Sequence, residues 1–131
     1  MKIMVCYDRS DVSEEALNVA KKHAKAFDAE RVYLVTSIKG GRDVPREAFA
    51  NAEHELNYAE SLLEEIKIPC DTHLLVRGLS AGEDLVEFAK EKGVEEIIIG
   101  IRKKSKVEKL LMGSTAQYVI LKAPCPVVAV K

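Results

Sequence analysis

Cysteine is scarce in this sequence, and its spacing excludes two classes of protein. The 131 residues include three cysteines, Cys6, Cys70 and Cys125, which lie far apart. Disulfide scaffolds and zinc sites use cysteines that are paired and closely spaced. Because an unpaired cysteine usually packs as a small apolar side chain, we expect three buried structural thiols rather than a disulfide framework.

Long apolar runs, a one-sided charge and a histidine cluster are missing as well. No apolar run approaches the roughly 18 residues that span a bilayer, and the opening MKIMVCYDRS turns polar too early for a signal peptide. A net charge of −1 does not favour nucleic-acid binding. His23, His54 and His73 lack the spacing of metal ligands. We therefore expect a cytoplasmic protein without a metal site, a membrane anchor or a nucleic-acid partner.

The composition that is present suits one globular domain over residues 1–131. Apolar residues make up 47% of the chain, which is enough to bury a sizeable core, and charged residues make up 31%. This balance is typical of a folded chain with a polar surface and not of a disordered one. The length fits a single core.

Short β-rich runs alternate with longer stretches of helical periodicity. Runs such as KIMVCY are nearly all apolar, which is typical of strands covered on both faces. Strands are predicted over residues 2–7, 31–38, 72–76, 95–100 and 126–130. Helices are predicted from Ser10 or Asp11, along the apolar stripe from Phe49 to Ile66, from Ser80 to Gly93, and from about Ser114 to Lys122. Since parallel strands need a crossover between them, the pattern predicts a five-stranded α/β sheet with helices on both faces.

Two of the helix starts carry capping signals. Asp11 and Glu14 have the spacing of a capping box, and so do Ser80 and Glu83. Ser10 is the other candidate for the cap of the first helix.

The residues that leave each strand are the candidates for a ligand site. In an open parallel sheet, ligands gather at the carboxyl ends of the strands. Here those residues are Asp8, Thr36 with Ser37, Arg77 with Gly78, and Gly100. Four familiar motifs are absent at these positions: the glycine-rich dinucleotide turn, the P-loop, the receiver-domain aspartate and the G-x-S-x-G nucleophile elbow.

The stretch from Gly100 to Thr115 predicts an anion site. Arg102, Lys103, Lys104 and Lys106 lie between a buried strand and the helix that begins near Gly113-Ser114-Thr115. Backbone amides at a helix start suit phosphate, and a glycine permits close approach. In the alternative interpretation Gly113 makes a turn, Ser114 caps the helix, and the lysines are ordinary solvated charges.

Four segments of the chain resemble the universal stress protein family. They are MVCYDRSDVSEEAL, GVEEIIIGIRKKS, KLLMGSTAQYVI and APCPVVAV. The family's nucleotide signature is G-x2-G-x9-G-[ST]. Gly100 fills its first position, Gly113-Ser114 close it, and Lys103 replaces its second glycine. The resemblance implies a doubly wound sheet in strand order 3-2-1-4-5, usually a homodimer, and ATP binding in the members that carry the full signature.

The resemblance also assigns residues to the nucleotide. Asp8 would meet the ribose or adenine, and Ser37 would lie along the adenine. Gly113 and the three residues after it would hold phosphate oxygens, and the role of Lys103 is open. The full set is Tyr7, Asp8, Ser37, Ile99, Gly100, Arg102, Lys103, Gly113, Ser114, Thr115 and Ala116. The expected cofactor is ATP or another adenine nucleotide, with Mg²⁺ as a candidate companion ion near Asp8.

The last predicted strand, residues 126–130, indicates a dimer. In the implied strand order it is an edge, and an exposed edge of valines needs a cover. Self-pairing across a two-fold axis would provide one. The predicted interface comprises Pro126, Val127, Val128, Ala129 and Val130.

Three functions stay open at this point. The first is a nucleotide-binding stress or signalling protein, and the second is a dimer that binds an unknown protein partner without nucleotide. The third is a slow ATPase or an autokinase that modifies Ser114 or Thr115. No pair of carboxylates or nucleophile–base pair is recognisable in the sequence, so we expect no enzyme and no catalytic residues.

Overall fold

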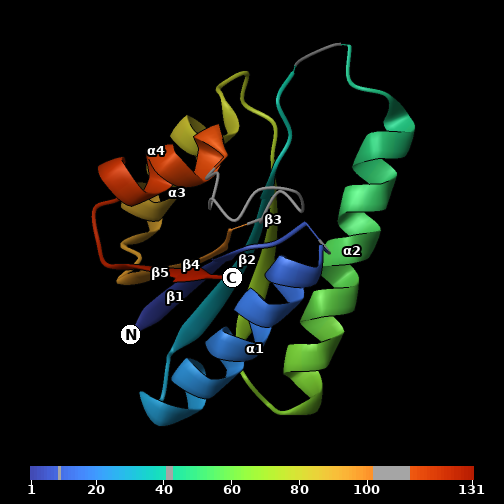
Figure 1. The fold of residues 1–131 in the computed structure, drawn as a ribbon. Coiled ribbons are helices and arrows are strands. Elements are labelled where there is room, and N and C mark those ends of the chain that lie inside the picture. The colour runs from blue at the N-terminus through green and yellow to red at the C-terminus, as the bar shows by residue number, and fades with distance from the viewer. Residues whose placement is uncertain (9, 41–42, 102–112) are drawn as a thin grey trace.

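The protein folds as a five-stranded parallel sheet with helices on both faces (Figure 1). The computed structural model describes residues 1–8, 10–40, 43–101 and 113–131. Its strands are β1 (Lys2–Cys6), β2 (Arg31–Ser37), β3 (Cys70–Leu75), β4 (Glu96–Gly100) and β5 (Val127–Val130). Its helices are α1 (Asp11–Ala26), α2 (Arg46–Glu65), α3 (Ala81–Lys92) and α4 (Ser114–Lys122). The strand order β3-β2-β1-β4-β5 confirms the predicted fold class.

The two faces of the sheet bury two separate cores because side chains alternate along each strand. On β1, Ile3 and Val5 face the core that α1 and α2 cover, whereas Met4 faces the core beneath α3 and α4. All three side chains are fully buried. Figure 1 shows α1 and α2 on one side of the sheet and α3 and α4 on the other. This arrangement explains why the central strands are apolar at nearly every position.

Side chains fix the beginnings of two helices. Ser80 caps α3, and its hydroxyl accepts a hydrogen bond from the Glu83 amide at 3.4 Å, as the capping-box spacing predicts. For α1 the cap is Ser10, whose hydroxyl accepts from the Ser13 amide at 3.3 Å. Asp11 is therefore the first helical residue, and the predicted Asp11–Glu14 capping box is wrong. Glu14 instead accepts a hydrogen bond from the Tyr7 hydroxyl.

The histidines and cysteines are dispersed over the fold. His23 on α1 lies 2.7 Å from a Glu96 carboxylate oxygen, and His73 on β3 packs against Phe88 with ring centroids 4.8 Å apart. Burial lowers the pKa of His73. The three cysteines are half-buried and form no disulfide. Among the described residues there is no group of three potential metal ligands.

None of the helices in the described ranges combines the length and the apolar character that a membrane span requires. The longest of them, α2, has 20 residues, but its buried face is a narrow stripe of four side chains, Ala52, Leu56, Ala59 and Leu63. Such a stripe is typical of a helix packed on a sheet with its opposite face in water.

Candidate functional site

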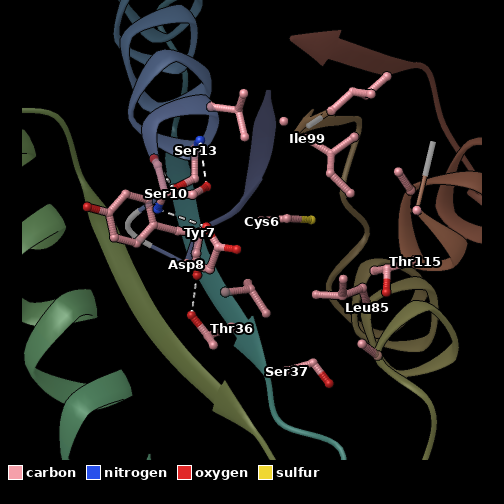
Figure 2. A pocket seen from close by; sticks show the side chains of 17 residues that line it. Cys6, Tyr7, Asp8, Ser10, Ser13, Thr36, Ser37, Leu85, Ile99 and Thr115 are labelled. Carbon is pink, nitrogen blue, oxygen red and sulfur yellow. Dashed lines mark hydrogen bonds between the residues drawn. The ribbon is translucent and has the colours of Figure 1, made fainter. Parts of the chain in front are cut away.

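A cavity of about 310 Å³ opens at the carboxyl ends of β1, β2 and β4. The N-terminal turns of α3 and α4 close its other side (Figure 2). This is the position where a doubly wound sheet reverses its strand order, since β1 is followed by β2 on one side and by β4 on the other. The cavity therefore lies at the edge of the sheet where the candidate residues were sought.

Most of the residues predicted for a nucleotide come together around this cavity. Those that line it are Tyr7, Asp8, Ser37, Ile99, Gly100, Gly113, Thr115 and Ala116. Ser114 is not among the lining residues. Arg102, Lys103 and the other basic residues between 102 and 112 lie outside the described residues.

Hydrogen bonds hold the segment that follows β1 in place. The Tyr7 ring is 2% exposed, and its hydroxyl donates to Glu14 on α1. The Tyr7 carbonyl accepts from the Thr36 hydroxyl at the end of β2. Asp8 accepts from the Ser10 amide at 3.0 Å, so its carboxylate is part of the turn into α1 (Figure 2). These bonds fix the position of Asp8 at the wall of the cavity.

The start of α4 presents backbone amides to the cavity. Gly113 is the N-cap, and the first hydrogen bond of the helix runs from the Gln117 amide to the Gly113 carbonyl at 3.1 Å. The amides of Ser114, Thr115 and Ala116 therefore have no acceptor within the helix. The helix dipole adds partial positive charge at this end. Ser114 is the first helical residue, so the interpretation in which it caps the helix is wrong.

Among the described residues, no conformational or packing constraint requires residue 113 to be glycine. Its φ of −64° and ψ of 160° are accessible to any residue. Apart from its chain neighbours, no heavy atom of the described residues lies within 4 Å of a Cβ built at this position. Gly113 is exposed and borders the cavity.

Gly100 is a contrasting case, because the fold itself requires it. A Cβ at this position would lie 2.9 Å from the backbone and from the side chain of Val12, in the first turn of α1. The glycine lets α1 pack closely against the end of β4. A packing constraint thus accounts for the first glycine of the signature, although the residue also lines the cavity.

An ion-pair network supports the β2 side of the cavity. Asp84 on α3 is fully buried and accepts from the Arg77 side chain at 2.5 Å and from the Ser37 hydroxyl at 3.3 Å. Arg77 also pairs with Glu91 at 2.7 Å. The hydrogen bond to Asp84 is the largest contribution that raises the pKa of Arg77. Arg77 was a candidate for ligand binding as a strand-end residue, but it does not line the cavity.

Sequence reasoning missed the apolar part of the cavity. Val35 lies two residues before Ser37 on the same face of β2, and Ala81 and Leu85 come from α3. The alternation along β2 contains a signal for Val35. The two α3 residues carry no local signal, because their place in the site depends on how α3 packs.

The cavity also contains a thiol of low reactivity. Burial, followed by the charge of Asp8, raises the pKa of Cys6 to about 12. At neutral pH this side chain is a protonated thiol and a poor nucleophile.

Comparison with known proteins gives one consistent result. The profile of the universal stress protein family matches residues 1–131. A universal stress protein of Methanocaldococcus jannaschii, MJ0531, is 36% identical over 140 residues, which cover 99% of this chain and 81% of that protein. A structure of a universal stress protein from Archaeoglobus fulgidus is 39% identical with a TM-score of 0.88, covering 100% of this chain and 93% of that one. A second structure from the same organism, in complex with dAMP, is 36% identical with a TM-score of 0.85 and covers 100% and 98%.

Proposed function

The chain belongs to the universal stress protein family, and we propose that it binds an adenine nucleotide in the cavity at the strand ends. The nucleotide is ATP, or ADP or AMP, and the protein acts in stress response or signalling. Bound nucleotide reports energy status in this proposal. The Archaeoglobus fulgidus relative in complex with dAMP supports it, because that chain is 36% identical over the whole of this one.

The observation that carries the proposal is the cavity that the start of α4 borders at the strand ends. Gly113, Thr115 and Ala116 line it. Glycine is an accepted N-cap residue, and because Gly113 has no side chain, it does not shield the amides of Ser114 to Ala116. A phosphate group in the cavity can therefore approach those amides.

The position of the helix end sets the direction of the nucleotide. With phosphate at α4, beside β4, the rest of the molecule extends across β1 towards β2. Two strand spacings are about 10 Å, which suits the distance from a nucleotide's phosphate to its base. The ribose then lies near Asp8, and the base lies between Ser37 and the apolar side chains of Val35 and Leu85.

The proposal includes Mg²⁺ as a companion ion for a nucleotide with more than one phosphate. Asp8 is the one carboxylate among the described residues that line the cavity, and a carboxylate oxygen suits Mg²⁺ bound between phosphates. Comparing AMP, ADP and ATP, with and without Mg²⁺, measures what the second and third phosphates contribute.

Isothermal titration of the purified protein with AMP, ADP and ATP tests the proposal. We expect saturable heat for at least one of them below a ligand concentration of about 1 mM, which corresponds to roughly −4 kcal/mol. Native mass spectrometry of gently purified protein is expected to detect a co-purifying adenine nucleotide. No heat up to that concentration for all three nucleotides would leave a protein that acts through protein contacts alone.

We further propose a homodimer through residues 126–130. In the sheet β5 pairs with β4 alone, which leaves its other edge unpaired among the described residues. The helix that precedes β5 in the chain, α4, exposes Leu121 by 78% and Ile120 by 37%. A second copy paired along β5 would cover an edge that is otherwise prone to aggregation.

Ala129→Pro tests the dimer. The Ile97 and Ile101 amides of β4 donate to the carbonyls of Pro126 and Val130, so the alternation along β5 directs the Ala129 amide to the outer edge. Proline removes that donor, and light scattering is expected to give the mass of a monomer where the wild type gives a dimer.

Tyr58→Ser, an exposed position on α2, is the control and is expected to stay dimeric. A dimer that persists in Ala129→Pro places the interface elsewhere.

A further inference from the structure

The hydroxyl of Ser37 stands at the end of the cavity where the proposed nucleotide would place its base. It lines the cavity at the end of β2 together with Val35, and Leu85 faces it from α3. Figure 2 shows Ser37 well away from Ile99, which is on the β4 side of the cavity. Among apolar neighbours of this kind, one polar group has a large influence on which base fits.

The hydrogen of that hydroxyl is already engaged. Ser37 lies 3.3 Å from one carboxylate oxygen of Asp84, and the other carboxylate oxygen takes the Arg77 Nε–H at 2.5 Å. A carboxylate paired with a guanidinium can only accept hydrogen bonds, so Ser37 must be the donor. Its oxygen therefore offers lone pairs, and no hydrogen, to the cavity.

The network is held rigidly enough to keep this polarity. Asp84 has 0% exposure, so water does not compete for its oxygens. A second Arg77 nitrogen donates to the Asp84 backbone carbonyl at 3.1 Å, and the guanidinium also pairs with Glu91. Reversing the Ser37 hydroxyl would leave a buried carboxylate oxygen without its donor, which is unfavourable.

We propose that Asp84 fixes Ser37 as a hydrogen-bond acceptor and thereby makes the site selective for a purine with an amino group at position 6. Adenine presents a donor at that position. Hypoxanthine and guanine present a carbonyl oxygen, which would face the lone pairs of Ser37. Ser37 is the contact and Asp84 is a positioning residue. The inference rests on the proposed nucleotide binding.

Titration with AMP and IMP measures this selectivity, because the two nucleotides differ at position 6 and at the neighbouring ring nitrogen. We expect the wild type to bind AMP about tenfold more tightly than IMP, the size of one hydrogen bond made against one left unpaired. In Ser37→Ala the ratio of the AMP affinity to the IMP affinity is expected to fall to within about threefold of one. Ser37→Thr keeps the hydroxyl and is expected to retain the wild-type ratio.

Asp84→Asn gives the sharpest test because it should reverse the polarity. Arg77 still needs an acceptor, so the amide oxygen turns towards it and the amide nitrogen donates to Ser37. The hydroxyl hydrogen then points into the cavity and favours the carbonyl of IMP. We expect the AMP preference to be lost or inverted in this variant. A change that only loosened the fold would weaken both nucleotides alike.

Thr115→Val is the matched control at the phosphate end. It is expected to weaken AMP and IMP by the same factor and to leave their ratio unchanged. Two results overturn the inference and leave the proposed function standing. One is a Ser37→Ala variant that keeps the wild-type ratio of AMP to IMP affinity, and the other is a wild type that binds AMP and IMP equally. Failure of the wild type to bind AMP, ADP, ATP or IMP overturns both proposals. If only ADP or ATP binds, ADP is compared with IDP, or ATP with ITP, in the same way. If Asp84→Asn does not fold, the affinities of Ser37→Ala and Ser37→Thr for AMP and IMP test the inference.

Discussion

Replacing Gly113 by valine is expected to abolish most nucleotide binding while the fold persists. Apart from its chain neighbours, no atom of the described residues lies within 4 Å of a Cβ at this position, and Gly113 borders the cavity, so we expect the branched side chain to reach into it. There it blocks the amides of α4 from a phosphate group. Losing two charge-assisted hydrogen bonds corresponds to a loss of at least about a hundredfold in affinity. Titration with AMP and ATP measures the loss, and thermal unfolding shows whether the fold is retained. We expect a change in unfolding free energy below about 1 kcal/mol, since valine is a poorer N-cap than glycine.

Gly100→Ala is the matched control, because it alters the other glycine shared with the signature. Its Cβ would lie 2.9 Å from the Val12 backbone, so α1 must move away from β4. Overpacking of this kind costs about 1–3 kcal/mol, and the loss should appear in the unfolding free energy. The result that contradicts this view is a Gly113→Val protein that unfolds as readily as Gly100→Ala, or one that still binds nucleotide as the wild type does.

The fold could be predicted from the sequence because its main features are local. Strands such as β1 and β4 are short apolar runs, and the helices between them carry stripes of alanine and leucine. Alternation of the two then requires parallel pairing. The position of the site followed from the rule that ligands lie at the carboxyl ends of strands, which placed Asp8, Ser37 and Gly100 at one edge of the sheet.

The rest of the site depends on packing between distant segments and carries no local signal. Ala81 and Leu85 reach the cavity because α3 and α4 approach closely at Gly82, where a Cβ would lie 2.8 Å from the Cβ of Tyr118. Nothing in the spacing of Gly82 and Tyr118 indicates this contact. The cap of α4 was similarly ambiguous, since Gly113 and Ser114 are adjacent and the geometry alone distinguishes them.

Arg77 illustrates how a correct position can support a wrong role. It follows β3, as a ligand-binding cation would, yet its guanidinium neutralises Asp84 beneath the cavity. A buried carboxylate requires such a partner. The sequence contains Arg77 and Asp84 seven residues apart, but only the turn between β3 and α3 brings the two side chains together.

Replacing Arg77 by methionine is expected to cost about 3 kcal/mol of stability. Methionine keeps much of the length and apolar character of the arginine side chain, but it leaves the fully buried carboxylate of Asp84 without its charge partner. Breaking a buried pair in this way costs about 3–5 kcal/mol. The low end applies because the Arg77 side chain is 35% exposed, so that water reaches its former place. For a chain of this length the loss corresponds to about 10 °C in melting temperature, which denaturant and thermal unfolding both measure.

Two further variants separate the buried half of this network from its exposed half. Glu91→Gln removes the other partner of Arg77, whose side chain is 49% exposed, and it should cost less than about 1 kcal/mol because exposed pairs contribute little. Arg77→Met combined with Asp84→Leu removes both buried charges and should be more stable than Arg77→Met alone. If Glu91→Gln costs as much as Arg77→Met, or if the double variant is the less stable one, the unpaired carboxylate is not the cause. The carboxylate of Asp84 thus has two roles, since it pairs with Arg77 and accepts the Ser37 hydroxyl hydrogen. A substitution of Asp84 should therefore change both the unfolding free energy and the selectivity for the base.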